Sequence, residues 1–210
     1  MHAAPGAVLA IAITALLASR AIAQSGAKAD PDWPCRQIKV QTYSLAAVWS
    51  GPELDLNSQS WRDESDIADL TAKMTHRRIP MADVESAIAG FKAKAGTDAD
   101  AKLLRAFGAA FQDLSQQRSQ ILDGIERFGR KQRAMADRIR AENEAVQESA
   151  DQNQGSQTPL STDSQERLRW DIRVFDDRRQ TITYVCETPT LIEQRIGAIA
   201  APCKRLFSDL

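Results

Sequence analysis

The sequence predicts an all-α protein: a long antiparallel helical hairpin similar to a coiled coil, with short helices packed at its base and room for one short N-terminal strand. Three observations lead to this prediction. Apolar residues recur every three or four positions, without Pro, between residues 98 and 148. A polar stretch of low complexity follows at residues 150–162. A second apolar stripe with the same spacing then begins at Leu168.

The first long helix is expected over residues 97–150. Ten of its thirteen seam positions between 104 and 146 are apolar, and the polar ones are Arg118, Gln132 and Glu142. At about 1.5 Å per residue this helix is about 75 Å long, so it must project from a compact domain of this size. Its predicted seam residues are Leu104, Phe107, Phe111, Leu114, Ile121, Ile125, Phe128, Met135 and Ile139.

Residues 151–162 are expected to form the hairpin tip, and residues 163–210 the returning helices. The seam residues predicted on the return are Leu168, Ile172, Phe175 and Ile182. Pro189 is expected to end or kink the first returning helix, with a last helical face after it.

Two further expectations concern the return. Residues 181–185 are rich in β-branched side chains and offer a strand that would pair with residues 37–43, but helix is favoured because the seam spacing continues through them. If the chain folds back near residue 156, Arg118 lies opposite the neighbourhood of Glu193. A paired charge there would fix the register of the hairpin.

The base of the hairpin is expected to come from the N-terminal third. Residues 24–59 read as an extended segment, with a hint of a short strand at 36–43. The spacing of apolar residues over 60–96 predicts two short helices. The first has Ser60 as its N-cap and runs about four turns, and the second starts at Pro80 and stops at Gly96.

Residues 1–23 read as a secretory signal peptide. An apolar run at 7–17 precedes Ala21-Ile22-Ala23, an A-x-A pattern that predicts cleavage between Ala23 and Gln24. The run is shorter than the roughly 20 residues of a spanning helix, so a retained anchor is the less favoured alternative. We expect a periplasmic or secreted protein without stable membrane insertion after cleavage.

The three cysteines fit an oxidising compartment, in which one pair and one free thiol are expected. A helix between Cys186 and Cys203 would hold these two apart. Cys35 is therefore expected to pair with Cys186, with Cys203 as the alternative partner. In the chain-entropy description, closing a loop of this length stabilises the fold by about 5 kcal/mol.

Composition argues against several chemistries. With 27 Lys and Arg against 28 Asp and Glu, the chain has no field that would collect phosphates, so we expect no nucleic-acid binding. Of the two His, only His76 lies in the mature part, and it sits beside Arg77 and Arg78. No metal-binding, phosphate-loop or haem-attachment motif is present. We expect no catalytic residue, no metal and no cofactor, and therefore not an enzyme.

Three blocks of the sequence are similar to those of uncharacterised secreted bacterial proteins. They are Asp32-Trp33-Pro34-Cys35, Ala47-Val48-Trp49-Ser50-Gly51-Pro52 and the segment Val185-Cys186-Glu187-Thr188-Pro189-Thr190-Leu191-Ile192-Glu193-Gln194-Arg195. The resemblance implies no activity. In architecture alone, a signal peptide followed by a long helical hairpin is similar to the Skp-type periplasmic chaperones. Those are strongly basic, whereas this chain without residues 1–23 has a net charge of −2.

These observations predict an exported protein-binding scaffold, adaptor or chaperone-like factor of the periplasm. The partner is expected to be another protein or a second copy that completes the seam. The alternative is an accessory subunit or enzyme of an envelope complex. The four tryptophans, at positions 33, 49, 61 and 170, are expected to pack in the core, or else to remain exposed as anchors for a partner.

Overall fold

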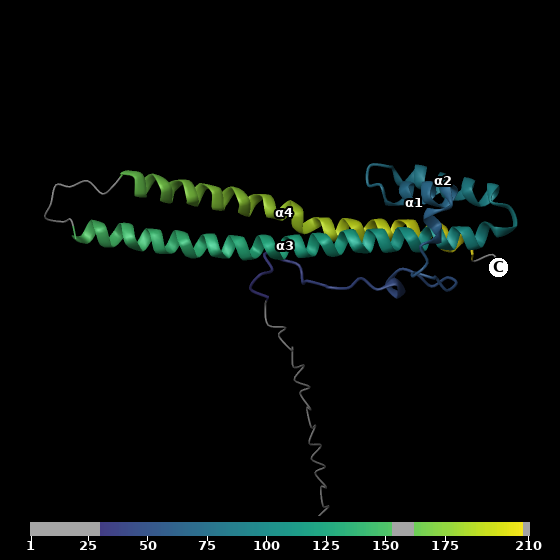
Figure 1. Cartoon of the computed structure of the whole chain (residues 1–210), viewed down its shortest axis with the longest axis horizontal. Helices are drawn as coiled ribbons and strands as arrows, with labels where there is room; N and C mark the ends of the chain where they lie inside the picture. Colours follow the sequence, from purple (N-terminus) through teal and green to yellow (C-terminus); the bar gives the residue numbers. More distant parts are fainter. Residues whose placement is uncertain (1–29, 153–161, 208–210) are drawn as a thin grey trace, which may run out of the picture.

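A computed structural model describes residues 30–152 and 162–207, and within these ranges the protein is all-α, without a strand (Figure 1). Its four helices are α1 (Ser65–Thr75), α2 (Met81–Lys94), α3 (Ala99–Gln152) and α4 (Thr162–Arg205). Short 3-10 turns lie at Leu45–Ala47 (η1), Ser60–Arg62 (η2) and Gly96–Asp98 (η3). Figure 1 shows α3 and α4 as a long hairpin with α1 and α2 at the end where α3 begins. The predicted fold class is confirmed.

The long helix α3 has 54 residues, which corresponds to about 80 Å. It forms because residues 99–152 contain no Pro and keep one apolar stripe throughout. Of the predicted tip at 151–162, residues 153–161 lie outside the described residues. The predicted signal peptide at 1–23 and the start of the leader at 24–29 lie outside them as well.

The return is a single helix, so the expectation that Pro189 ends it is wrong, whereas the alternative of a kink at Pro189 stays a prediction. Pro189 removes one backbone donor, which normally breaks a helix. Here Pro189 is buried, and it continues a series of seven-residue steps whose other members from Ile182 to Cys203 are also buried. Packing along this face holds the helix together across the missing bond. Residues 181–185 are helical as favoured, and the strand alternative is wrong.

The hint of a strand at residues 36–43 is also wrong. This segment is extended, but residues 181–185 are helical and offer it no strand partner. Its course along α3 is visible in Figure 1. Two of its backbone carbonyls, those of Val40 and Gln41, accept hydrogen bonds from an arginine of α3 instead of from a strand.

The start of α1 differs from the prediction, whereas both ends of α2 agree with it. Ser60 does not cap α1, because it begins the separate 3-10 turn η2 and the N-cap position of α1 is taken by Glu64. Helix α1 begins five residues later and spans 11 residues rather than about four turns. In contrast, α2 follows Pro80 and ends before Gly96 as predicted. Gly96 takes a φ of 68°, a left-handed conformation that favours glycine after a helix.

The main core lies at the base, where all four helices meet. Each contributes fully buried apolar side chains, including Ile67 and Met74 of α1, Val84 and Ile88 of α2, Phe107 of α3, and Ile196 and Ile199 of α4. Trp49 of the N-terminal segment stacks on Phe107, with 4.4 Å between the ring centroids. Because every helix shares this core, the base anchors one end of the hairpin.

Arg195 joins α4 to the end of α1. Its guanidinium donates to the carbonyls of Met74 at 2.7 Å, Ile79 at 3.2 Å and Lys73 at 3.2 Å. A helix leaves its last carbonyls without intrahelical donors, and a cation at that end also suits the helix dipole. Partial burial of this side chain lowers the pKa of Arg195.

The N-terminal segment crosses α3 at Gly129, where a side chain would have no room. A Cβ atom at this position would overlap the Asp32 carbonyl and lie 3.1 Å from Pro34. The disulfide at Cys35 holds the neighbouring chain in place. The close approach therefore depends on glycine.

We expect Gly129→Ala to lower the free energy of unfolding by about 1–3 kcal/mol, because the added methyl group must displace the segment. Gly124→Ala is the matched control five residues away on α3. Its nearest new neighbour is an Arg127 guanidinium nitrogen at 3.8 Å, so helix propensity should raise stability by about 0.5–1 kcal/mol. Urea unfolding measures both, and a stabilised Gly129→Ala protein would contradict the close approach.

Candidate functional site

Arg118 of α3 is a buried charged side chain, with 2% of its surface exposed. Its Nε donates to Glu193 Oε1 of α4 at 2.6 Å. Its Nη2 and Nη1 donate to the carbonyls of Val40 at 2.6 Å and Gln41 at 3.2 Å. The predicted pairing of Arg118 with Glu193 is confirmed. We call this set of contacts the Arg118 clamp, because one side chain joins α3, α4 and the N-terminal segment.

Tyr43 lies beside the clamp, with the Arg118 guanidinium carbon 5.8 Å from the centroid of its ring. Burial raises the pKa of Tyr43, the charge of Glu193 raises it further, and Arg118 lowers it. The phenol therefore stays neutral at neutral pH.

The disulfide joins Cys35 to Cys186, the favoured pair, with 5.6 Å between the Cα atoms. The Gln37 side-chain amide donates to the Cys186 carbonyl and ties the same two segments again. Cys203, the alternative partner, is a fully buried free thiol in the base core. Burial raises the pKa of Cys203 to about 12, so the thiol stays protonated and unreactive near neutral pH.

Most of the predicted seam residues point into the hairpin or its base. Phe107, Phe111, Leu114, Ile125, Met135, Leu168 and Ile182 are buried, and Leu104, Ile121, Phe128, Ile139 and Phe175 are half-buried. The prediction for Ile172 is wrong, since 42% of its surface is exposed. The three-residue step from Leu168 leads to Asp171, which takes this seam position to pair with Arg138.

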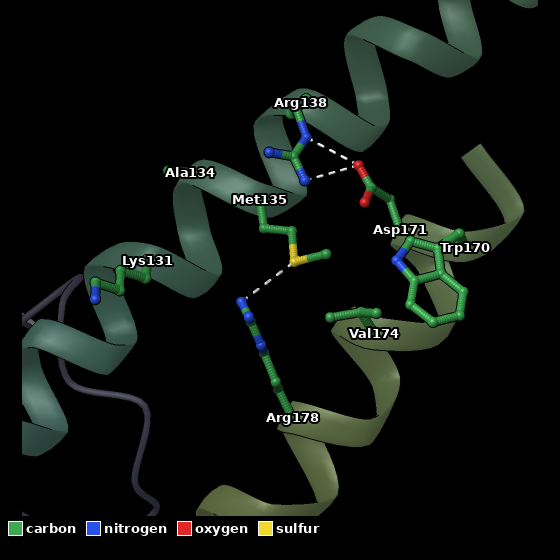
Figure 2. Close-up of a pocket in the computed structure, with 8 residues that line it drawn as sticks. All are labelled: Lys131, Ala134, Met135, Arg138, Trp170, Asp171, Val174 and Arg178. Atoms are coloured by element: carbon green, nitrogen blue, oxygen red, sulfur yellow. Dashed lines mark hydrogen bonds and ion pairs between the residues drawn. The ribbon is translucent and has the colours of Figure 1, made fainter. Parts of the chain in front are cut away.

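A shallow groove of about 410 Å³ lies between α3 and α4 in the outer half of the hairpin (Figure 2). We call this outer half, residues 130–152 and 162–180, the arm. From α3 the groove is lined by Lys131, Ala134, Met135 and Arg138. From α4 it is lined by Trp170, Asp171, Val174 and Arg178.

Ion pairs and a sulfur contact fix the polar side chains of the groove. Arg138 donates through Nε at 2.9 Å and through Nη2 at 2.7 Å to the same oxygen of Asp171, as Figure 2 shows. Arg178 places a guanidinium nitrogen 3.7 Å from the Met135 sulfur. These contacts pair Arg138 with Asp171 and hold Arg178 against an uncharged sulfur. The groove thus presents an apolar rim beside one ion pair and the side chains of Arg178 and Lys131.

Trp170 forms that rim, and 62% of its surface is exposed. In contrast, Trp49 is buried and Trp33 and Trp61 are half-buried. Interpreting all four rings as core packing therefore fails for Trp170. The heptad itself carries the signal that distinguishes it: Trp170 lies two residues after the seam position Leu168, which in a helix places it well off the seam.

Tyr184 and Leu191 follow Trp170 at intervals of 14 and 21 residues, so all three share one face of α4. Tyr184 is 75% exposed and Leu191 53% exposed. Val174, on the same face, is half-buried in the groove. Large apolar side chains exposed in a series along one helix are typical of an interaction surface.

Residues 30–152 and 162–207 contain no cluster of His, Cys, Asp or Glu that could hold a metal ion. Within the same ranges, no helix is long and apolar enough to cross a membrane. His76 lies at the end of α1, where its Nδ1 accepts a hydrogen bond from the Arg78 amide at 3.4 Å.

Comparison of the chain with protein-family models, with curated proteins and with solved structures finds no match. The resemblance of its three sequence blocks to secreted bacterial proteins therefore stays a prediction.

We expect Arg118→Leu to lower the free energy of unfolding by about 3 kcal/mol, because Glu193 and two carbonyls lose their donor. Adding Glu193→Leu should recover part of that loss by removing the unpaired charge. Arg140→Leu is the control, since Arg140 pairs with Asp137 on the surface of α3 and should cost at most about 0.5 kcal/mol. Denaturant unfolding of the four proteins measures this, and equal losses for Arg118→Leu and Arg140→Leu would contradict it.

Proposed function

We propose that this protein is an exported scaffold, adaptor or chaperone-like factor whose arm binds another protein chain. The exposure of Trp170 on the rim of the groove is the observation that carries this proposal. A tryptophan buries a large apolar area when a partner covers it, and such rings are the commonest anchors of protein interfaces.

The shape of the site favours a protein over a small molecule. Small-molecule sites are concave and enclose most of the ligand surface. The groove here is shallow, and the exposed side chains continue beyond it along α4 to Tyr184 and Leu191. An extended face of this kind suits a helix or another elongated partner.

Export is the second part of the proposal. It rests on the signal-like residues 1–23 and is supported by the disulfide between Cys35 and Cys186, since disulfides persist outside the reducing cytosol.

We expect a photoreactive benzoylphenylalanine in place of Trp170 to form covalent adducts with protein in cells that express the chain. Ile172 is the matched control, because it is also exposed and apolar but lies on the other flank of α4. Gel mobility and mass spectrometry identify the products. Equal labelling from both positions, or none from Trp170, would overturn the proposed binding role.

We expect the protein recovered from the periplasmic fraction to begin at Gln24. Ala23→Leu should block processing because the A-x-A site needs a small residue there, whereas Ile22→Val at the middle position should be processed normally. N-terminal sequencing measures both, and an intact residue 1 in the exported protein would contradict cleavage at this site.

A further inference from the structure

The partner that best fits the arm is a second copy of this chain. We propose that two copies associate through the groove face of their arms, antiparallel and related by a two-fold axis that passes beside Trp170. This inference rests on the proposed binding role of the arm and names its partner.

The first argument is the charge distribution along α3. Between residues 130 and 140 the helix carries five basic residues and one acidic residue, Asp137. Between 142 and 148 it carries three acidic residues and no basic one. An antiparallel second copy lays the acidic section of each arm over the basic section of the other. A parallel copy would set like charges together, which is unfavourable.

The groove side of α3 gives the register. Lys131 and Arg138 line the groove, and helical spacing continues their face through Ala141 and Ala145 to Glu148. Reversing the helix about a point between Arg138 and Ala141 sets Lys131 of one copy against Glu148 of the other. The same reversal sets Ala134 against Ala145, two exposed residues whose small side chains let the helices approach.

The other charges of α3 near this face are already engaged within the chain. Arg138 is bonded to Asp171 and lies 3.7 Å from Glu142. Asp32 pairs with Arg130 and Arg133 where the N-terminal segment crosses α3. That segment covers the side of α3 that bears Gly129, whereas the groove lies between α3 and α4. Lys131 and Glu148 therefore supply the charge complementarity between copies.

The position of the two-fold axis also explains why Trp170 is exposed in a single chain. Arg138 is bonded to Asp171, so the point between Arg138 and Ala141 on α3 lies level with the region of residue 170 on α4. In the antiparallel pair each Trp170 lies near the axis and packs against the second arm. A two-fold interface uses the same surface on both subunits, so one exposed ring per chain gives a paired apolar centre.

Light scattering of the purified protein is expected to give twice the mass of one chain. The mass of one chain is 23.1 kDa before any leader is removed. Lys131→Glu or Glu148→Lys alone should raise the dimer dissociation constant at least about tenfold, because each change creates two like-charge contacts. The double variant Lys131→Glu with Glu148→Lys should return it to within about threefold of the original. Glu144→Lys, on the outer side of α3, is the control and should change it less than about threefold.

Cysteine cross-linking tests whether the two arms run antiparallel. A chain with Ala134→Cys mixed with a chain with Ala145→Cys should form an interchain disulfide under mild oxidation, and neither chain should form one with itself. The pair Asp137→Cys and Asn143→Cys is the control, since both residues are exposed and lie on either side of nearly the same point but on other faces of α3. Small-angle scattering should place the two bases about 120 Å apart, against about 80 Å for the length of one hairpin.

The outcomes separate this inference from the proposed function. An Ala134→Cys chain that cross-links to itself, a dimer that Trp170→Ala leaves intact, or a monomer at all concentrations would overturn the antiparallel dimer. Adducts from position 170 that contain a different protein, together with a monomeric mass, would overturn the dimer and leave the proposed binding role standing. A monomer without adducts from position 170 would overturn both.

Discussion

The buried guanidinium of Arg118 is the constraint on which the hairpin depends. A charge withdrawn from water is tolerated only when partners replace the lost hydration, and here those partners come from α4 and from the N-terminal segment. Further along, Gln132 donates to the Phe175 carbonyl and Arg138 pairs with Asp171. These contacts agree with one alignment of the two helices. A slip of one heptad would separate Arg118 from Glu193 and Arg138 from Asp171, so these two side-chain pairs define the register of the hairpin.

Stability is distributed unevenly along this hairpin. At the base, four helices and Trp49 share one core, and the disulfide and the Arg118 clamp add the N-terminal segment as a third layer. In the part of the chain that the structure describes, that segment follows α3 as far as Gly129 and Arg133. Beyond it the arm consists of two helices with a single seam. Fewer buried contacts mean lower local stability, and surfaces that bind partners are commonly found in such regions.

Spacing in the sequence was enough to predict the hairpin, the favoured cysteine pair, the contact of Arg118 with Glu193 and most of the seam. It failed where tertiary contacts outweigh a local rule. Pro189 stays within a helix because its face is buried, and Ile172 is exposed because the ion pair of Asp171 takes the seam position. Ser60 fails as a cap because it begins a separate 3-10 turn, five residues before α1 begins. The heptad places Trp170 off the seam, but the groove beside it required the relative placement of both helices, which spacing on one helix does not give.

A dimer centred on Trp170 would cover that ring but would leave other exposed apolar residues of α4 free for a different protein. The proposed overlap involves α3 from Lys131 to Glu148 and the part of α4 level with it. Tyr184 and Leu191 lie closer to the base, on the same face of α4 as Trp170, and both are exposed. In an antiparallel pair, Tyr184 and Leu191 of each copy lie outside the region where the arms overlap. The two copies therefore present these residues toward opposite ends of the dimer. Self-association would then produce a rod with a free apolar face beside each base, which is the geometry that a two-ended scaffold requires.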